Sequence, residues 1–460
     1  MTDIVQKLWG FCNILRHDGI DYGDYIEQLT YLLFLKMADE KKLPIPARYG
    51  WSSLRDKSGN ELADHYTDTL RNLGKEKGIL GEIFNGALSR FNNPVNLKKL
   101  IGLIDEIEWT SLGVDIKAQA YEGLLEKAAA EGKKGAGQYF TPRILIDSIV
   151  KVMKPDPRPK KDFTIHDPAA GTGGFLIESY EWLMEQTKGA IPREMIDRIT
   201  KYTYSGVELV RRPKVLALMN LYLHGLDDGI YIGNSIEDPL TGKQYDCVLT
   251  NPPFGNKGAN QAPNRDDFTI STSNKQLNFV QHILSILKPG GRAAIVLPDS
   301  VLFEEKAADV FEIVMKDCSL HTILRLPDGT FSPYSQGIKA NVIFLTKGIP
   351  TKKVWIYDAR TNIPKVTKKG RPLTKQHFVG FEQCYGSDPF GRSERKESER
   401  FRVFDIEEIR DRGFHLDIEW IAPNNLNLFI NSEPETLLET IKERTYDIHK
   451  RLENMQKVLE

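Results

Sequence analysis

From about residue 138 onward, short apolar runs alternate with stretches of helical periodicity, and this alternation constrains the fold more than any other feature. Seven runs have the composition of buried strands: 163–166, 203–207, 230–232, 245–250, 292–297, 322–326 and 341–346. Strands separated by helices predict an α/β fold with a doubly wound, mainly parallel sheet of seven strands. The last two runs are joined by a long loop without a helical pattern, so we expect a terminal antiparallel pair.

At 460 residues, the chain is too long for one compact core, and its patterns divide it into three parts. Residues 1–132 are predicted to be an all-helical N-terminal domain, with buried helices at 31–37, 97–104 and 118–130. Residues 133–425 form the predicted α/β domain, although its last part, 350–425, has an irregular and charged sequence. Residues 426–460 are predicted to be a C-terminal helix for subunit assembly.

The C-terminal helix has two signals of its own. Ser432-Glu433-Pro434-Glu435 is a capping-box pattern with proline in the first turn. Apolar residues then follow at alternating steps of three and four from Leu438 to Leu459, which predicts a coiled-coil seam of about three heptads. The alternative is a helix that packs on its own domain.

Composition excludes several classes of protein. No apolar run approaches the ~18 residues of a membrane span, and the first residues have no signal-peptide pattern. The four cysteines are scattered and form no CxxC pair, so we expect a cytoplasmic protein with no disulfide framework and no metal site: Cys12, Cys247, Cys318 and Cys384. The net charge is −1, so any binding to DNA must depend on a local basic surface or on a partner.

The charge is unevenly distributed. Between Ile338 and Gln376 there are ten basic residues, and Asp358 is the only acidic one. This pattern predicts either contact with phosphate groups or a solvated loop.

A glycine-rich turn follows the first predicted strand, and its residues are candidates for cofactor binding: Asp167, Ala170, Gly171, Thr172 and Gly173. A dinucleotide site requires an acid ~20 residues beyond the glycines, whereas the acid that ends the next strand, Glu208, lies further away. A turn that opens with Asp167 suits a cationic ligand such as S-adenosylmethionine. Asp167 would meet its amino-acid end, and Glu208 would accept its ribose hydroxyls. An exposed acid at a strand end is the alternative for Glu208.

Two further segments are candidates for the same pocket. One precedes the sheet and comprises Gln138, Tyr139, Phe140, Thr141, Pro142 and Arg143. We expect Thr141 and Pro142 to be the N-cap and first residue of a helix whose backbone N–H groups could hold the cofactor carboxylate. The other segment, Asn234-Ser235, follows the third strand, where the adenine ring of the cofactor would lie.

The candidate catalytic residues, Asn251, Pro252, Pro253 and Phe254, follow the strand at 245–250. A delocalised lone pair makes a planar amino or amide nitrogen a poor nucleophile. The Asn251 side-chain oxygen and the Pro252 carbonyl could accept hydrogen bonds from such a nitrogen and activate it for methyl transfer. The ring of Phe254 could stack on the flat group that carries it. An ordinary proline-rich turn is the alternative. Asp299 is left out of the site because this reaction needs no strong base before attack.

Six segments occur in a fixed order: GQYFTP, DPAAGTGGF, the acid of GVEL, NPPF, LKPGGRAAIVLP and TFSPYSQGIKANVIFLTKG. In this order the chain resembles the modification subunit of type I restriction-modification enzymes, which are γ-order DNA adenine-N6 methyltransferases. The resemblance implies an S-adenosylmethionine-dependent methyltransferase fold, in which NPPF binds a flipped adenine. It also implies that a separate specificity subunit reads double-stranded DNA and contacts the C-terminal helix. Two copies of this chain per specificity subunit are expected.

Other functions stay open at this point. An Asn-Pro-Pro-aromatic turn also serves methyltransferases that modify an RNA base or a protein glutamine, although these normally lack the helical N-terminal region. Cytosine N4 is another target, for which serine usually replaces Asn251. A non-catalytic assembly subunit is a third class. The sequence does not give the DNA target, the preferred methylation state or whether a restriction subunit joins.

Overall fold

The computed structural model describes residues 22–109 and 141–422, except for residues 228, 239–241, 255–260, 305, 333–336 and 368–369, together with the isolated Gly10 and Thr445. The predicted helix at 118–130 and the C-terminal helix after Ser432 therefore lie outside the described residues. Both domain boundaries, near 132 and 426, lie there as well and stay predictions.

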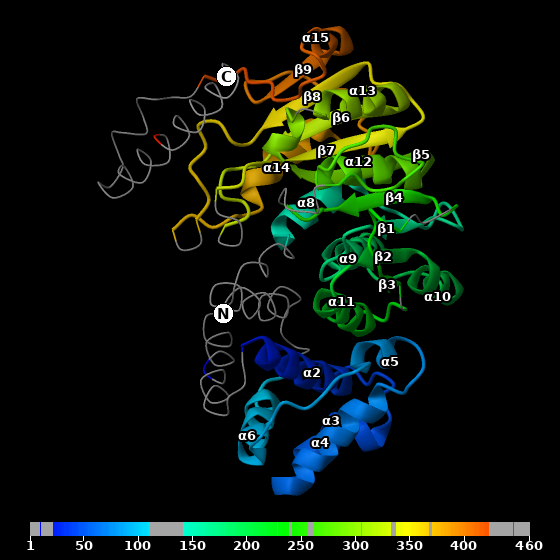
Figure 1. Cartoon of the computed structure of the whole chain (residues 1–460), viewed down its shortest axis with the longest axis vertical. Coiled ribbons are helices and arrows are strands. Elements are labelled where there is room, and N and C mark those ends of the chain that lie inside the picture. Colours follow the sequence, from blue (N-terminus) through cyan, green and yellow to red (C-terminus); the bar gives the residue numbers. More distant parts are fainter. Residues whose placement is uncertain are drawn as a thin grey trace.

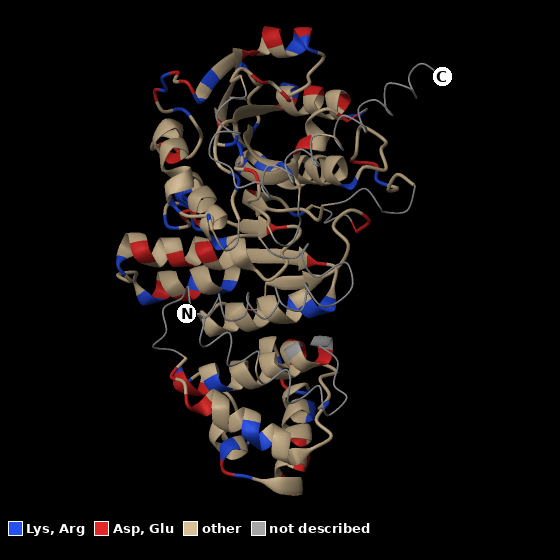
Figure 2. Cartoon of the chain, turned by 90° about the vertical axis from the view of Figure 1, so that its left-hand side faces the viewer, with Lys and Arg blue, Asp and Glu red and all other residues tan. Residues whose placement is uncertain are grey.

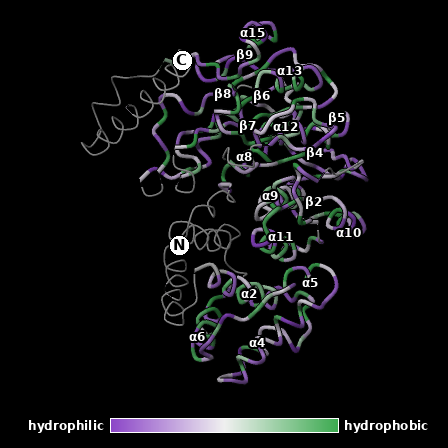
Figure 3. Tube along the Cα trace, viewed as in Figure 1, coloured by the Kyte–Doolittle hydropathy of each residue, from purple (hydrophilic) through white to green (hydrophobic). Residues whose placement is uncertain are grey.

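Residues 22–109 form a helical unit at the bottom of Figure 1: α2 (Tyr22–Glu40), η1 (Ala47–Tyr49), α3 (Trp51–Arg55), α4 (Gly59–Leu73), α5 (Ile79–Phe84) and α6 (Pro94–Asp105). The apolar segment 31–37 lies in α2 and is buried except for Lys36, as predicted. Asn93 caps α6, because its side chain accepts a hydrogen bond from the Val95 N–H. Hydrophobic and hydrophilic stretches alternate along these helices (Figure 3), so each helix buries one stripe.

The α/β region contains one sheet, whose described strands are β1 (Ile165–Asp167), β2 (Tyr204–Glu208), β3 (Ile230–Ile232), β4 (Tyr245–Thr250), β5 (Leu287–Pro298), β6 (Cys318–Arg325), β7 (Ala340–Lys347), β8 (Lys353–Asp358) and β9 (Phe401–Asp405). Their order is β3-β2-β1-β4-β5-β7-β6-β8-β9. Strands β1 to β5 run parallel, whereas β7 is antiparallel to both of its neighbours. The predicted mainly parallel α/β fold is confirmed.

The predicted number of strands was too small, because the sheet has nine strands among the described residues and not seven. The two missed strands, β8 and β9, lie in the segment that the sequence suggested to be irregular. Strand β9 is an edge strand of only five residues with mostly exposed or half-exposed positions, so its apolar signal is weak. The antiparallel pair β6–β7 is confirmed, but it is not terminal, because β8 continues the sheet beyond β6.

Helices cover both faces of the sheet, as a doubly wound fold requires. One hydrophobic core takes residues from α8 (Arg143–Met153), α9 (Gly174–Thr187), α10 (Arg193–Tyr202), α11 (Arg211–Leu223) and α14 (Gln376–Tyr385). The other takes residues from α12 (Lys275–Ile286), η3 (Asp299–Leu302), α13 (Ala307–Asp317) and α15 (Ile406–Asp411).

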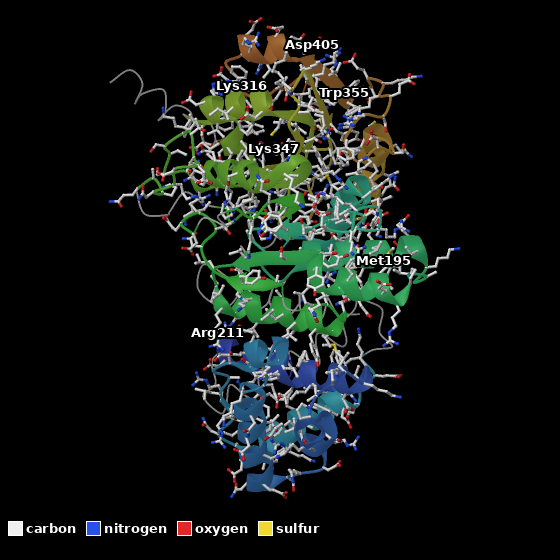
Figure 4. The ribbon with its side chains drawn as sticks, turned by 90° about the vertical axis from the view of Figure 1, so that its right-hand side faces the viewer. Met195, Arg211, Lys316, Lys347, Trp355 and Asp405 are labelled. Carbon is white, nitrogen blue, oxygen red and sulfur yellow. The ribbon has the colours of Figure 1, made fainter. Side chains whose placement is uncertain are left out.

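Helix α11 joins the helical unit to the sheet. The first of these two cores continues from α11 into α2 and α5, and the rings of Phe34 and Tyr222 pack 5.5 Å apart across the junction. Lys214 of α11 forms an ion pair of 2.9 Å with Glu82. Figure 4 shows Arg211 at this junction, where its guanidinium lies against Gly86. The helical unit therefore packs directly on the helix that follows Glu208.

Candidate active site

The glycine-rich turn leads from β1 into α9. Gly171 and Gly173 have positive φ angles of 53° and 80°, which side chains other than glycine rarely adopt. Gly206 on the neighbouring strand β2 lets the turn approach, because a Cβ there would lie 2.9 Å from the Cβ of Ala170. The turn therefore lies at the carboxyl ends of β1 and β2, where ligands of open α/β sheets bind.

Asp167 is buried at the start of this turn. One of its oxygens accepts hydrogen bonds from the Ala169 N–H at 3.0 Å and from the Thr250 hydroxyl at 2.7 Å. Burial raises the pKa of Asp167 to about 7, with a smaller rise from the charge of Glu208. Because Thr250 is the last residue of β4, Asp167 links the turn to the strand that carries Asn251.

Glu208 ends β2 and is only 6% exposed, so the alternative of an exposed strand-end acid is wrong. Its carboxylate accepts hydrogen bonds from the N–H groups of Gly171 at 2.9 Å and Val210 at 2.8 Å. Burial raises its pKa. Two exposed apolar side chains adjoin it: Leu209 follows in sequence, and Ile232 is its register partner on β3. The sequence analysis missed both, since each looked like an ordinary strand residue.

The loops after β1 and β3 are held together by polar contacts. The Ser235 hydroxyl donates to the Pro168 carbonyl at 2.6 Å, and the Asn234 side chain accepts from the Ile236 N–H at 3.1 Å. The Thr172 carbonyl accepts from the side chain of Asn220 in α11 at 3.1 Å. Asn234 and Ser235 thus lie beside the glycine-rich turn, and these hydrogen bonds of both residues support the loop structure.

Asn251 follows β4 directly, as the sequence predicted, and has an unusual hydrogen-bonding state. Its side-chain Nδ2 donates to the Thr141 hydroxyl at 2.9 Å. Its Oδ1 is buried, and no donor among the described residues reaches it. A buried acceptor without a partner costs roughly 1–3 kcal/mol, so this oxygen is suited to a ligand N–H group.

The rest of the Asn-Pro-Pro-Phe turn is fixed by two contacts that sequence reasoning missed. Buried Gln276 in the first turn of α12 donates from Nε2 to the Pro253 carbonyl at 2.8 Å. The ring of Phe254 packs edge-on against Phe331, with ring centroids 5.2 Å apart. Phe331 belongs to the TFSPYSQGIKAN segment, so the fold brings that segment to the turn. Gln276 gave no signal because it lies 23 residues from its partner.

The segment before α8 needs a correction. Pro142 is the N-cap and Arg143 the first helical residue, so the predicted cap was one residue too early. The Thr141 hydroxyl accepts a hydrogen bond from the Asn251 side chain. Arg143 faces α9, where it forms ion pairs with Glu178 at 3.6 Å and Glu181 at 3.8 Å. The predicted binding residues Gln138, Tyr139 and Phe140 lie outside the described residues.

Asp299 was left out of the predicted site, and its carboxylate is bound by Arg360 and Asn341. Arg360 donates to both of its carboxylate oxygens, and Asn341 donates to Oδ1 at 2.6 Å. Burial alone would raise the pKa of Asp299, but the hydrogen bonds and charge of Arg360 lower it overall. This carboxylate therefore organises the sheet edge and is not poised as a base.

Within the described ranges, no group of three or more His, Cys, Asp and Glu side chains could hold a metal ion. In the same part of the chain, no helix combines the length and apolar character needed to cross a membrane.

The fold and the Asn-Pro-Pro-Phe turn define a methyltransferase, and comparison with known families supports this class. The N-6 DNA methylase family model matches residues 113–425, and the HsdM N-terminal domain model matches residues 4–44. The methylase subunit of the StySPI type I restriction enzyme from Salmonella potsdam is 41% identical over 447 residues, covering 90% of this chain and 83% of that protein. The EcoKI methylase subunit from Escherichia coli K12 is 40% identical over 449 residues, with the same coverage.

Solved structures agree. The EcoKI M protein superposes with a TM-score of 0.58 at 34% identity and covers 96% of this chain and 94% of its own. A modification subunit of a putative type I enzyme from Vibrio vulnificus YJ016 has a TM-score of 0.76 at 26% identity, over 93% and 99% of the two chains. The chain belongs to the N-6 DNA methylases and, within them, to the methylase subunits of type I restriction enzymes. It is an adenine-specific DNA methyltransferase, which sets aside an RNA base, a protein glutamine or cytosine as its target.

Proposed function

We propose that this chain transfers a methyl group from S-adenosylmethionine to N6 of an adenine flipped out of DNA, as the modification subunit of a type I complex. The observation that carries the proposal is the buried Oδ1 of Asn251, which no donor among the described residues reaches. An adenine amino group would supply that donor. Its second N–H would meet the Pro252 carbonyl, and the ring of Phe254 would stack on the base.

The cofactor side of the proposal rests on two acids at the carboxyl ends of adjacent parallel strands. Asp167 would meet the ammonium group, and Glu208 would accept the ribose hydroxyls, since each carboxylate oxygen has acceptor capacity beyond its present bonds. The exposed side chains of Leu209 and Ile232 offer an apolar surface for the adenine ring. Backbone N–H groups at the start of α8 are candidates for the carboxylate.

When bound, S-adenosylmethionine would supply an electrophilic methyl group on its sulfonium; attack by adenine N6 would displace S-adenosylhomocysteine, and the proton lost from N6 would go to water. The residues of this chain bring the two reactants together. The Thr250 hydroxyl contacts Asp167 in the cofactor turn, and Asn251, the next residue, faces the target. One rigid strand end would therefore fix both partners, and such pre-organisation accounts for much of the rate.

The proposed partners are double-stranded DNA and a specificity subunit, with two copies of this chain per specificity subunit. A solved structure described as showing complex assembly of a type I restriction-modification system is 28% identical, with a TM-score of 0.72 over 99% of this chain. A net charge of −1 also suits a subunit that shares DNA binding with a partner. A restriction subunit would join the same complex.

The test is labelled methyl transfer to DNA by the chain mixed with its cognate specificity subunit, followed by nucleoside analysis. We expect label in N6-methyladenine alone, and roughly 10²–10³-fold slower labelling with the Asn251→Ala variant. Label in cytosine, or turnover near the wild-type rate in the variant, would overturn the proposal.

Assembly is tested separately by deleting residues 433–460. The catalytic segments precede this stretch, so cofactor binding should persist while co-elution with the specificity subunit in size-exclusion chromatography is lost. Full co-elution would show instead that the C-terminal helix serves its own domain.

A further inference from the structure

A basic arm, residues 359–373, leaves the carboxyl end of β8 and leads to α14 (Figure 1). It contains five lysine and arginine residues and no aspartate or glutamate. In Figure 2, by contrast, cations and acids are interspersed along the helices of the molecule. Within the arm, Thr367 and Arg371 pair as an isolated antiparallel bridge.

The base of the arm is anchored by Arg360, whose side chain is 5% exposed. Its guanidinium donates to the carboxylate of Asp299 after β5, to the Leu326 carbonyl after β6 at 3.1 Å and to the Ala340 carbonyl of β7 at 2.9 Å. One side chain thus joins the ends of three strands to the end of β8. The arm therefore has a defined position at the carboxyl edge of the sheet, the edge that carries the candidate active site.

The arm packs against the loop that reaches the Asn-Pro-Pro-Phe turn. The Val366 N–H donates to the Asp328 carbonyl at 2.8 Å. Gly329 permits this approach, because a Cβ there would lie 2.2 Å from the Val366 carbonyl oxygen. Two residues later in the same loop, Phe331 packs on Phe254. Only one loop therefore separates the arm from the aromatic ring proposed to hold the target base.

The cations of the basic segment have different surroundings. Lys347 bonds the Leu287 carbonyl at 2.9 Å, and Lys353, although exposed, pairs with Asp405 at 3.4 Å, so these two support structure. Lys339, Lys365 and Arg371 are also exposed, and the Lys365 side chain lies against Gly329 of the Phe331 loop.

Two of these cations act on the half-buried carboxyl group of Asp328. Burial raises the pKa of Asp328, and the positive charges of Lys339, Arg360 and Lys365 oppose that rise. Both ammonium groups therefore lie within electrostatic reach of Asp328, at the point where the arm meets the loop.

We propose that the basic arm, through Lys365 and Arg371, contacts DNA backbone phosphates next to the flipped adenine. This inference rests on the proposed function. A duplex whose base enters the pocket beside Phe254 must bring its backbone close to that pocket. Phosphate contacts carry no sequence information, which suits a subunit whose partner reads the sequence. The arm would fix the duplex relative to Phe331 and Phe254.

The double variant Lys365→Gln/Arg371→Gln tests the proposal in the complex with the specificity subunit. Affinity for a target duplex is measured by fluorescence anisotropy over a range of salt concentrations. Log affinity falls as log salt concentration rises, and each lost phosphate contact makes this negative slope shallower by about 0.9. We therefore expect a slope that is shallower by about 1.8, together with weaker binding of every duplex sequence.

The matched control, Lys316→Gln/Lys352→Gln, removes the same charge from exposed positions at the opposite edge. Lys316 lies near the end of α13 (Figure 4), just before β6, and Lys352 lies just before β8, which runs parallel to β6. Equal slopes for the two double variants would overturn the proposal. Loss of co-elution with the specificity subunit in the arm variant alone would overturn it in favour of a protein interface. Nucleoside analysis of the wild-type product distinguishes either result from a failure of the proposed function.

Discussion

The two halves of the candidate site differ in how their acceptors are satisfied. On the cofactor side, Asp167 and Glu208 accept hydrogen bonds from neighbouring groups of the fold. On the target side, Oδ1 of Asn251 is buried and meets no donor among the residues that the structure describes. The first half is held in shape by its own bonds, whereas the second carries an energetic cost that a substrate could remove.

Replacing Asn251 with alanine should have the largest effect, because it should lower the rate of methyl transfer without changing cofactor affinity. We expect methyl transfer to fall at least 10²–10³-fold, because a polar contact to the reacting group is lost. Cofactor affinity, measured by calorimetry, should stay near the wild-type value, since the acids that meet the cofactor are untouched. Comparable losses of affinity and rate would show that the halves are not independent.

Glu208→Ala and Gly173→Asp should damage the cofactor half. The loss of charge-assisted hydrogen bonds worth roughly 1.5–3 kcal/mol predicts S-adenosylmethionine binding weaker by about ten- to a hundredfold for Glu208→Ala. In Gly173→Asp, a φ of 80° strains the new residue, and its Cβ would lie 3.4 Å from that of Ala217. Calorimetry with unchanged affinity in either variant would refute the proposed pocket.

Thr141→Val tests whether the hydroxyl that binds Asn251 positions it. One neutral hydrogen bond contributes roughly 0.5–1.5 kcal/mol, so kcat should fall up to about tenfold with little change in KM for the cofactor. Thr141→Ser keeps the hydroxyl and should restore kcat. If serine and valine behave alike, Thr141 has only a packing role.

Asp167→Asn concerns the pH dependence of stability and not the rate of methyl transfer. Burial raises the pKa of Asp167 to about 7 in the folded protein, above its usual value of 3.8. Its stabilising contribution is therefore complete below about pH 4 and is lost as the pH rises through about 7, by roughly 1.4 kcal/mol per pH unit between the two.

The Asp167→Asn variant should lack this pH-dependent contribution to the free energy of unfolding, while its side-chain oxygen can still accept a hydrogen bond from Thr250. Denaturant unfolding at several pH values measures the difference between the two proteins. A constant difference from pH 4 to pH 8 would contradict the raised pKa.

Part of this architecture followed from sequence because it depends on local pattern. The strand at 245–250 and the turn after it were placed correctly, since a short, mostly apolar run before Asn-Pro-Pro leaves few alternatives. The missed strand β9 shows the limit of this reasoning. Four of its five residues are exposed or half exposed at the sheet edge, and only pairing with β8 makes Phe401–Asp405 a strand.

The sequence by itself determined the class of fold, the order of the motifs and the positions of Asn251 and Glu208 at strand ends, because these depend on residue type and on periodicity along the chain. The tertiary structure alone decided which groups meet across it. Asn251 binds Thr141, 110 residues away, and Arg360 binds Asp299, 61 residues away. Such contacts depend on how strands are ordered in the sheet, and no local pattern records that order. The helix cap was predicted at Thr141, one residue too early, because the sequence does not show that the Thr141 hydroxyl bonds Asn251. The buried side-chain oxygen of Asn251, which no described donor reaches, is likewise visible only in the tertiary structure.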